Sequence, residues 1–149
     1  MQPDAFVLEQ APGYLIRRAH QISVAVFAEH TVCFDATPMQ FAVLSVLSDA
    51  PGVDQITLAQ RAAFDAATIG SVVGRLITKG WVHRQPAERD RRRKLLWLTP
   101  EGEQALAGIA ALMPDVQARV LGGLDAAERQ QLRALLAKLV AHHASALPE

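Results

Sequence analysis

The basic side chains of this chain are concentrated in residues 84–94. This stretch holds six basic and two acidic side chains, a local net charge of about +4, although the whole chain carries 15 of each sign. The basic residues are Arg84, Arg89, Arg91, Arg92, Arg93 and Lys94. Clustered cations can neutralise phosphates and release the counterions that surround a nucleic acid. The cluster therefore predicts a surface that binds a polyanion.

The elements on either side of the cluster predict how it is presented. Residues 81–84 and 94–98 are strand-like and flank the charged loop, so we expect a β-hairpin with a cationic tip. Upstream, a short helix starting near Asp54 is joined by a tight turn to a second helix, which runs to about Lys79 and has Gly80 as its expected C-cap. Two short helices followed by such a hairpin are typical of a winged helix-turn-helix.

The second of these short helices has a face suited to DNA. Opposite its apolar stripe it carries mainly small or polar residues, which allow the helix backbone to approach base edges closely. An ordinary surface helix is the alternative, but each glycine in a helix costs about 1 kcal/mol relative to alanine. The candidate DNA contacts on this helix are Ala67, Thr68, Gly70, Ser71 and Arg75.

Four further helices are expected. Two of them cover residues 14–30 and 100–121. Another begins with Thr37 as its N-cap and Pro38 as its first residue, and the last begins after Asp125, which can form a capping box with Glu128. Pro114 should kink or interrupt the helix at residues 100–121. The fold class is therefore mainly α with a small β-hairpin wing.

The terminal helices carry more apolar surface than a small central module can cover. Exposed apolar patches of this kind normally mark an interface, and a dimer built from the two ends of the chain would cover them. The residues in need of partners are Leu106, Ile109, Leu112 and Met113 on one helix, and Leu132, Leu135, Leu136 and Leu139 on the other.

Composition narrows the class of protein further. The single cysteine excludes an internal disulfide framework and a thiolate metal cluster within one chain. The adjacent His142 and His143 point about 100° apart on a helix, so no intrinsic metal site is expected. We expect no cofactor, no membrane span and a cytoplasmic location. The chain shows no catalytic triad order, phosphate-cradling glycine loop or carboxylate pair, so we do not expect an enzyme.

Six motifs occur in an order that resembles the MarR (multiple antibiotic resistance regulator) family of transcriptional regulators. They are TPMQFAVL at 37–44, TLAQ at 57–60, TIGSVVGRL at 68–76, GWV at 80–82, DRR at 90–92 and LTPEG at 98–102. The resemblance extends over about residues 14–145.

The resemblance implies an architecture and a partner. Residues 1–149 would be a single chain with a winged helix-turn-helix DNA-binding lobe at 37–99. Residues 10–34 and 100–146 would form the dimerisation helices. The homodimer would bind double-stranded DNA at a pseudo-palindromic operator, as a repressor that a small ligand releases. A protein-interaction module that uses the same fold without DNA is the alternative.

The resemblance also assigns roles within the charged loop. It implies that Asp90 and Arg92 pair and fix the shape of the wing, while Arg91 or a neighbour, Arg89 or Arg93, reaches DNA. This chain departs from the family by adding Arg93 and Lys94, so the contacting cation stays open. A solvated loop pair of Asp90 and Arg92, worth less than about 1 kcal/mol, is the alternative.

The expected input of such a regulator is a small aromatic or phenolic acid. Residues 14–21 resemble the branch of the family that controls aromatic-acid catabolism. A cation near the first helix could pair with the carboxylate of the effector, although solvated arginines and packed histidines are the alternative. The candidate contacts are Tyr14, Arg18, His20 and His30. A redox input through Cys33 is a second alternative, against which we expect a buried, inert cysteine.

Overall fold

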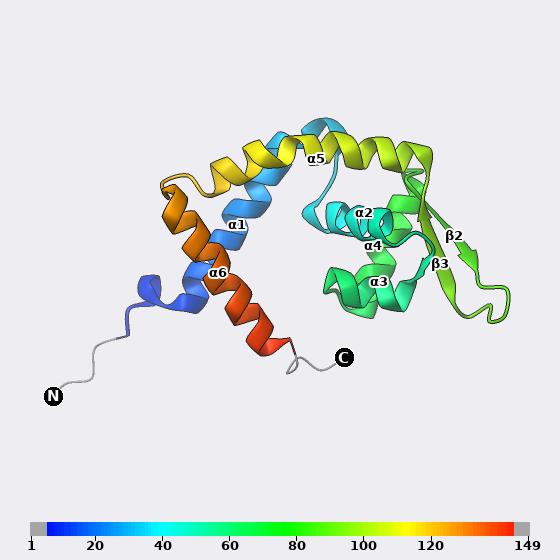
Figure 1. Cartoon of the computed structure of the whole chain (residues 1–149), viewed down its shortest axis with the longest axis horizontal. Coiled ribbons are helices and arrows are strands. Elements are labelled where there is room, and N and C mark those ends of the chain that lie inside the picture. Colours follow the sequence, from blue (N-terminus) through cyan, green and yellow to red (C-terminus); the bar gives the residue numbers. More distant parts are fainter. Residues whose placement is uncertain (1–5, 145–149) are drawn as a thin grey trace.

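The structure is a computed structural model that describes residues 6–144. Helix α5 joins a central lobe, built from the middle of the chain and ending in a projecting β-hairpin, to an arm that contains α1 and α6 (Figure 1). The central lobe contains α2 (Pro38–Asp49), β1 (Val53–Asp54), α3 (Gln55–Ala62), α4 (Ala66–Thr78), β2 (Val82–Pro86) and β3 (Lys94–Leu98). The other elements are η1 (Leu8–Gln10), α1 (Pro12–His30), η2 (Val32–Phe34), α5 (Pro100–Val120) and α6 (Ala126–His143).

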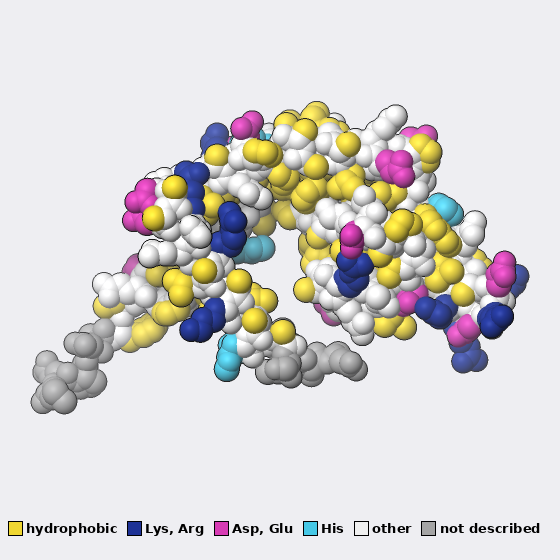
Figure 2. Space-filling view, in the orientation of Figure 1, with side chains coloured by type: hydrophobic (Ala, Val, Ile, Leu, Met, Phe, Trp, Pro, Cys, Tyr) yellow, Lys and Arg dark blue, Asp and Glu magenta, His cyan; other side chains and the backbone are white. Residues whose placement is uncertain are grey.

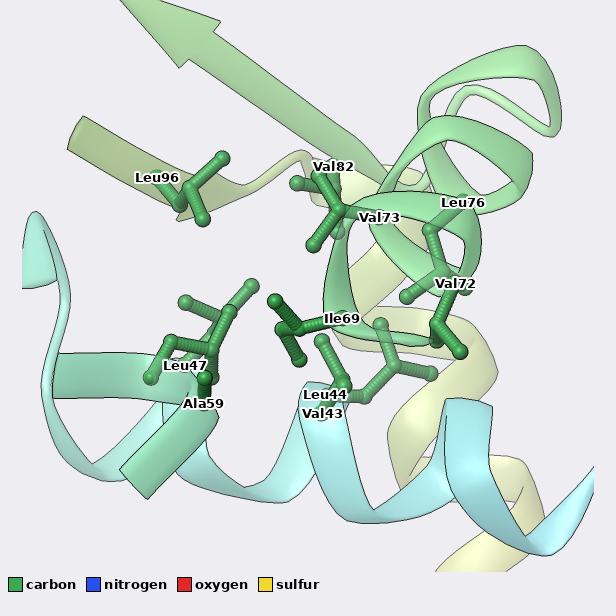
Figure 3. Packing of buried hydrophobic residues seen from close by; sticks show 11 residues of the cluster. Val43, Leu44, Leu47, Ala59, Ile69, Val72, Val73, Leu76, Val82 and Leu96 are labelled. Carbon is green, nitrogen blue, oxygen red and sulfur yellow. The ribbon is translucent and has the colours of Figure 1, made fainter. Parts of the chain in front are cut away.

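The core residues of the central lobe are buried by contacts within a single chain. Helix α4 buries its residues at positions 69, 72, 73 and 76, which is the spacing of one helical face. Leu44 of α2, Ile69 of α4 and Leu96 of β3 are almost fully buried in the same cluster (Figure 3). The short helices α3 and α4 are therefore held rigidly, as a DNA-binding helix pair requires.

Local capping signals fix where the helices start. The side chain of Thr37 accepts a hydrogen bond from the backbone N–H of Gln40, and the Gln40 side chain accepts one from the N–H of Thr37. Asp125 and Glu128 form the same reciprocal box at the start of α6. At the end of α4 the C-cap is Lys79, and Gly80 follows it with a φ of +77°, so the predicted cap is one residue out.

The wing belongs to a three-stranded sheet with the order β1-β3-β2, so the predicted two-stranded hairpin was incomplete. The missing strand is two residues long and pairs Val53 with Leu96 and Asp54 with Leu95. A strand so short carries no periodicity, and it forms because Gly52 and the residues after it run beside β3. The fold class itself, mainly helical with a small wing, is confirmed.

Helix α5 runs through Pro114 without a break, so of the two predicted effects, a kink or an interruption, the interruption was wrong. Proline removes one helical hydrogen bond, but packing on both sides of it holds the helix together. Ile109 and Val116 are both buried, one on each side of Pro114. The expectation that Ile109 needs a partner chain was also wrong, because it lies in a second cluster with Val26 and Phe27 of α1.

Helix α6 behaves differently, since none of its described residues is buried. The segment predicted for dimerisation extends to residue 146, and residues 145 and 146 lie outside the described part of the chain. No helix within residues 6–144 is long and apolar enough to cross a membrane.

Candidate nucleic-acid interface

The start of α4 is fixed by a carboxylate and left open to solvent. The Asp65 side chain accepts hydrogen bonds from the backbone N–H of Thr68 at 2.7 Å and from its hydroxyl at 2.8 Å. These bonds lower the pKa of Asp65 below its usual value. Ala66 and Ala67, the first residues of the helix, are exposed. The first turn of α4 is thus ordered and accessible.

Four of the five residues predicted on α4 lie together around one hollow. The hollow has a volume of about 390 Å³ and lies between the start of α2 and the outward face of α4. The predicted residues that line it are Ala67, Thr68, Ser71 and Arg75. Small side chains beside one exposed arginine give a surface that can follow the edge of a base pair.

Gly70 lies on a different side of α4 from the other predicted residues. A Cβ atom at Gly70 would lie 3.8 Å from the side-chain nitrogen of Gln55 at the start of α3, which is an ordinary van der Waals contact. Gly74, by contrast, has open space where its Cβ would be. Gly70 is half-buried beside α3 and does not line the hollow, whereas Gly74 faces open space.

The wing consists of β2, β3 and the loop at residues 87–93, and it carries the exposed cations. Figure 2 shows Lys and Arg side chains gathered at its outer end. Arg89, Arg91 and Arg92 are exposed and make no ion pair within residues 6–144. Their positive charge is therefore available to an external anion.

The loop is shaped by Asp90, although not through the predicted partner group. Its carboxylate accepts a hydrogen bond from the backbone N–H of Arg92 at 3.0 Å, and no ion pair joins the two side chains in the described chain. The implied contact between Asp90 and Arg92 is thus present through the backbone of Arg92 and not through its guanidinium. An aspartate readily bonds to the backbone two residues further on, which leaves the Arg92 guanidinium free.

Arg93 is the wing arginine that is already paired. Its guanidinium donates to the Asp54 carboxylate at 3.0 Å, and the side chains are 58% and 14% exposed. Hydrogen bonds from Thr57 and from Arg93 lower the pKa of Asp54 to about 2. The sequence signal for Asp54 was its place before a helix, but its partner depends on the pairing of β1 with β3.

The four predicted effector contacts do not meet in one site of a single chain. Tyr14 and His30 lie 16 residues apart on α1, about 24 Å along the helix axis. Arg18 donates to the Gln21 side chain at 2.9 Å, and His20 is exposed. The Nδ1 atom of His30 lies 2.8 Å from the carbonyl oxygen of Val26, so this ring is tied to its own helix.

An apolar pocket that the sequence did not reveal lies where α1, α2 and α5 meet. Its volume is about 280 Å³, and Phe27 and Phe41 contribute rings 6.0 Å apart. Ser23 and Gln117 are its polar side chains, and none of the four predicted effector contacts lines it. Contributions from three distant segments explain why no local pattern marked it.

Cys33 is exposed, so the expectation of a buried cysteine was wrong. It lies in η2, where the neighbouring Phe34 takes the inward position and packs against the second core cluster.

Comparison with known proteins places these features in a family. A model described as "MarR family" matches residues 34–93, which include α2, α3, α4 and most of the wing. The chain is similar to NicR, an HTH-type transcriptional repressor of Pseudomonas putida. The two are 32% identical over 134 residues, which cover 90% of this chain and 84% of NicR.

Two solved structures extend the similarity to the whole fold. One is BpsR of Bordetella bronchiseptica, whose DNA binding is regulated by 6-hydroxynicotinic acid. It is 30% identical with a TM-score of 0.84, over 90% of this chain and 96% of BpsR. The other is a variant of MarR from Escherichia coli bound to operator DNA. It is 27% identical with a TM-score of 0.83, over 93% of this chain and 99% of that one.

Proposed function

Because the chain belongs to the MarR family of transcriptional regulators, we propose that it is a homodimeric repressor that binds a pseudo-palindromic operator and is released by an aromatic carboxylate. The observation that carries the proposal is an open α4 face accompanied by unpaired arginines on the adjoining wing. The chain acts in the cytoplasm by binding and not by catalysis.

DNA recognition is divided between α4 and the wing. Helix α4 enters the major groove with Ala67, Thr68 and Ser71 toward the base edges, and Arg75 supplies a donor pair for a guanine or a phosphate. The wing lies along the backbone, where Arg89 and Arg91 neutralise phosphates. The helix therefore provides most of the sequence preference, and the wing provides affinity that depends on salt.

The dimer is formed by the arm. Apolar side chains of residues 6–10, α1 and α6 are exposed in the single chain, and a second copy would cover them. They are Phe6, Leu8, Leu15, Ile16, Ile22, Leu135, Leu136, Leu139 and Val140. A two-fold dimer presents two copies of α4, and this symmetry matches a pseudo-palindromic operator.

The effector enters the pocket between α1, α2 and α5. The rings of Phe27 and Phe41 suit an aromatic ligand, and Ser23 and Gln117 can bond to its polar groups. BpsR, whose DNA binding responds to an aromatic acid, supports this ligand class. Among the predicted contacts, His20 lies one turn before Ser23 on α1, so it is the best placed to reach a carboxylate at the pocket mouth.

Tyr14, Arg18 and His30 remain proposed contacts of the effector only in an assembled dimer. None of the three lines the pocket of its own chain. The partner subunit would have to bring them to the ligand.

Selection from a pool of random-sequence duplexes tests the proposal directly. We expect the protein to enrich a sequence with inverted half-sites one helical turn apart, and to bind it as a dimer. Thermal unfolding with 6-hydroxynicotinate, salicylate and benzoate tests the effector, and benzamide is the matched control without a charge. A binder of the folded dimer raises its melting temperature by mass action. Failure to enrich any sequence would contradict DNA recognition, and equal effects of benzoate and benzamide would contradict a carboxylate effector.

A further inference from the structure

We infer that Arg93 is a positioning residue that holds the wing against the helix-turn-helix through Asp54, and that it is not one of the DNA contacts of the wing. The inference rests on the proposed DNA binding and refines the site that performs it. It separates Arg93 from Arg89 and Arg91, with which the sequence had grouped it.

Strand register puts the two side chains within reach of each other. Asp54 pairs with Leu95 across β1 and β3, and Arg93 is two residues before Leu95. Residues offset by two from a direct pair point to the same face of a sheet and are diagonal neighbours. A long side chain spans such a diagonal, and the Arg93 guanidinium lies 3.0 Å from the Asp54 carboxylate. The contact is therefore built into the sheet.

Asp54 is held in place by other bonds, so it is a firm anchor. One oxygen accepts from the backbone N–H of Thr57 at 3.0 Å, and the other accepts from the Thr57 hydroxyl at 2.9 Å as well as from Arg93. Asp54 is also the N-cap of α3. The wing is thus tied to the first turn of a helix that packs directly against α4.

Arg93 also determines the shape of the loop through its backbone. Its carbonyl oxygen accepts from the N–H of Ala87 at 2.9 Å, and its N–H donates to the carbonyl oxygen of Asp90 at 3.0 Å. Backbone bonds therefore close the loop at the residue whose side chain reaches the body of the lobe. Loss of the ion pair would free the loop that carries Arg89 and Arg91 to swing relative to α4.

Release of Arg93 to a DNA phosphate would be unfavourable. It would leave the mostly buried Asp54 carboxylate without its cationic partner on a surface that faces a polyanion. The arginines further along the loop can reach phosphates with no such loss, since they make no ion pair in residues 6–144.

A double-mutant cycle on DNA affinity separates positioning from contact. The change Asp54→Asn keeps a good N-cap but removes the ion pair. If Arg93 positions the wing, Asp54→Asn weakens binding of the selected duplex about fivefold, although it removes a negative charge near DNA. Arg93→Ala has a similar effect, and the double variant is no weaker than either single one. Arg93→Lys restores part of the affinity.

The opposite pattern would overturn the inference. If Arg93 contacts DNA, Asp54→Asn tightens binding or leaves it unchanged, and Arg93→Ala weakens it equally in both backgrounds. Arg93→Ala would then also lower the salt slope of the affinity by about 1, as loss of one phosphate contact does.

Amide hydrogen exchange in the free protein tests the same ion pair without DNA. We expect Asp54→Asn to speed exchange at the N–H groups of Ala87 and Arg93, while Ile69 in the core of the lobe is unaffected. If Asp54→Asn left exchange at these two wing amides unchanged, the inference would be overturned, whatever the affinity of the variant for DNA. If the wild type bound no duplex at all, the proposed function would fail while this measurement still decided the role of Arg93.

Discussion

The central lobe and the arm cover their apolar side chains to very different extents. In the lobe, Leu44, Leu58 and Leu96 have no exposed surface, and one cluster joins α2, α3, α4 and the sheet. In the arm, Leu135 is 65% exposed and Val140 is 63% exposed, and α6 has no buried residue. The lobe buries its apolar side chains within one chain, whereas the arm leaves them exposed.

This difference indicates that DNA binding belongs to the lobe and that assembly belongs to the arm. A lobe with a fully buried core can hold α4 and the wing at a fixed angle, which sequence-specific DNA binding requires. An open arm requires a second chain, so DNA affinity depends on assembly as well as on the lobe. The apolar pocket lies where α1, α2 and α5 meet, between these two regions, so a ligand there can alter how they are joined.

Substitutions that disrupt the proposed dimer interface on the arm should have the largest effect on operator binding. The double change Leu136→Glu and Leu139→Glu puts two carboxylates into the proposed interface, and we expect dimer affinity to fall about 100-fold or more, with operator binding lost at the same concentrations. Analytical ultracentrifugation measures the assembly. Gln130→Glu, a change at an exposed polar position of the same helix, is the control and should leave the dimer intact. A stable dimer of the double variant would show that α6 is not at the interface.

Damage to the lobe should reduce stability without acting through assembly. Leu44 is fully buried, so Leu44→Ala should lower the free energy of unfolding by about 3 kcal/mol. Urea denaturation at several protein concentrations measures this, and the loss should be the same at each. A loss that grew as the protein was diluted would indicate that the lobe also depends on the partner chain.

Removal of one free wing cation should have a smaller effect. We expect Arg91→Ala to weaken operator binding about fivefold and to lower the salt slope by about 1, since one phosphate contact is lost. Fluorescence anisotropy at several salt concentrations gives both values. Arg119, which pairs with Glu29 on the surface of α5 and α1, provides the control Arg119→Ala. Equal slopes for Arg91→Ala and the wild type would remove Arg91 from the contacts.

The smallest expected effect concerns pH. The pKa of Asp54 is lowered from 3.8 to about 2 in the folded chain, so its contribution to stability is complete above pH 3.8 and is lost as the pH falls toward 2. The wild type should therefore lose more stability than Asp54→Asn over this range. Urea denaturation at pH 5 and pH 3 measures the difference, and parallel losses in the two proteins would contradict the assigned pKa.

The parts of the fold predicted from sequence are those that local rules determine. The Thr37 N-cap and the capping box of Asp125 and Glu128 depend on side chains that bond within three residues, and both occur as expected. The continuous α5 was missed because burial on both sides of Pro114 overrides a local preference.

The missed parts of the site depend on contacts between distant segments. The partner of Arg93 is set by a two-residue strand that has no pattern of its own. The half-buried position of Gly70 beside Gln55 depends on how α3 meets α4, which a helical wheel of α4 alone does not contain. Residue type alone indicates the effector candidates on α1, whereas the pocket is formed by side chains from α1, α2 and α5.

The salt dependence of operator binding by the intact protein is the sharpest test of whether the chain is a dimeric DNA-binding regulator. A duplex selected by the wild type is titrated at several salt concentrations, and both affinity and stoichiometry are recorded. We predict two chains per duplex and a logarithm of affinity that falls linearly and steeply with the logarithm of salt concentration, because the wings of both subunits release counterions. Binding of one chain per duplex, or an affinity that salt leaves unchanged, would contradict a dimeric DNA-binding regulator.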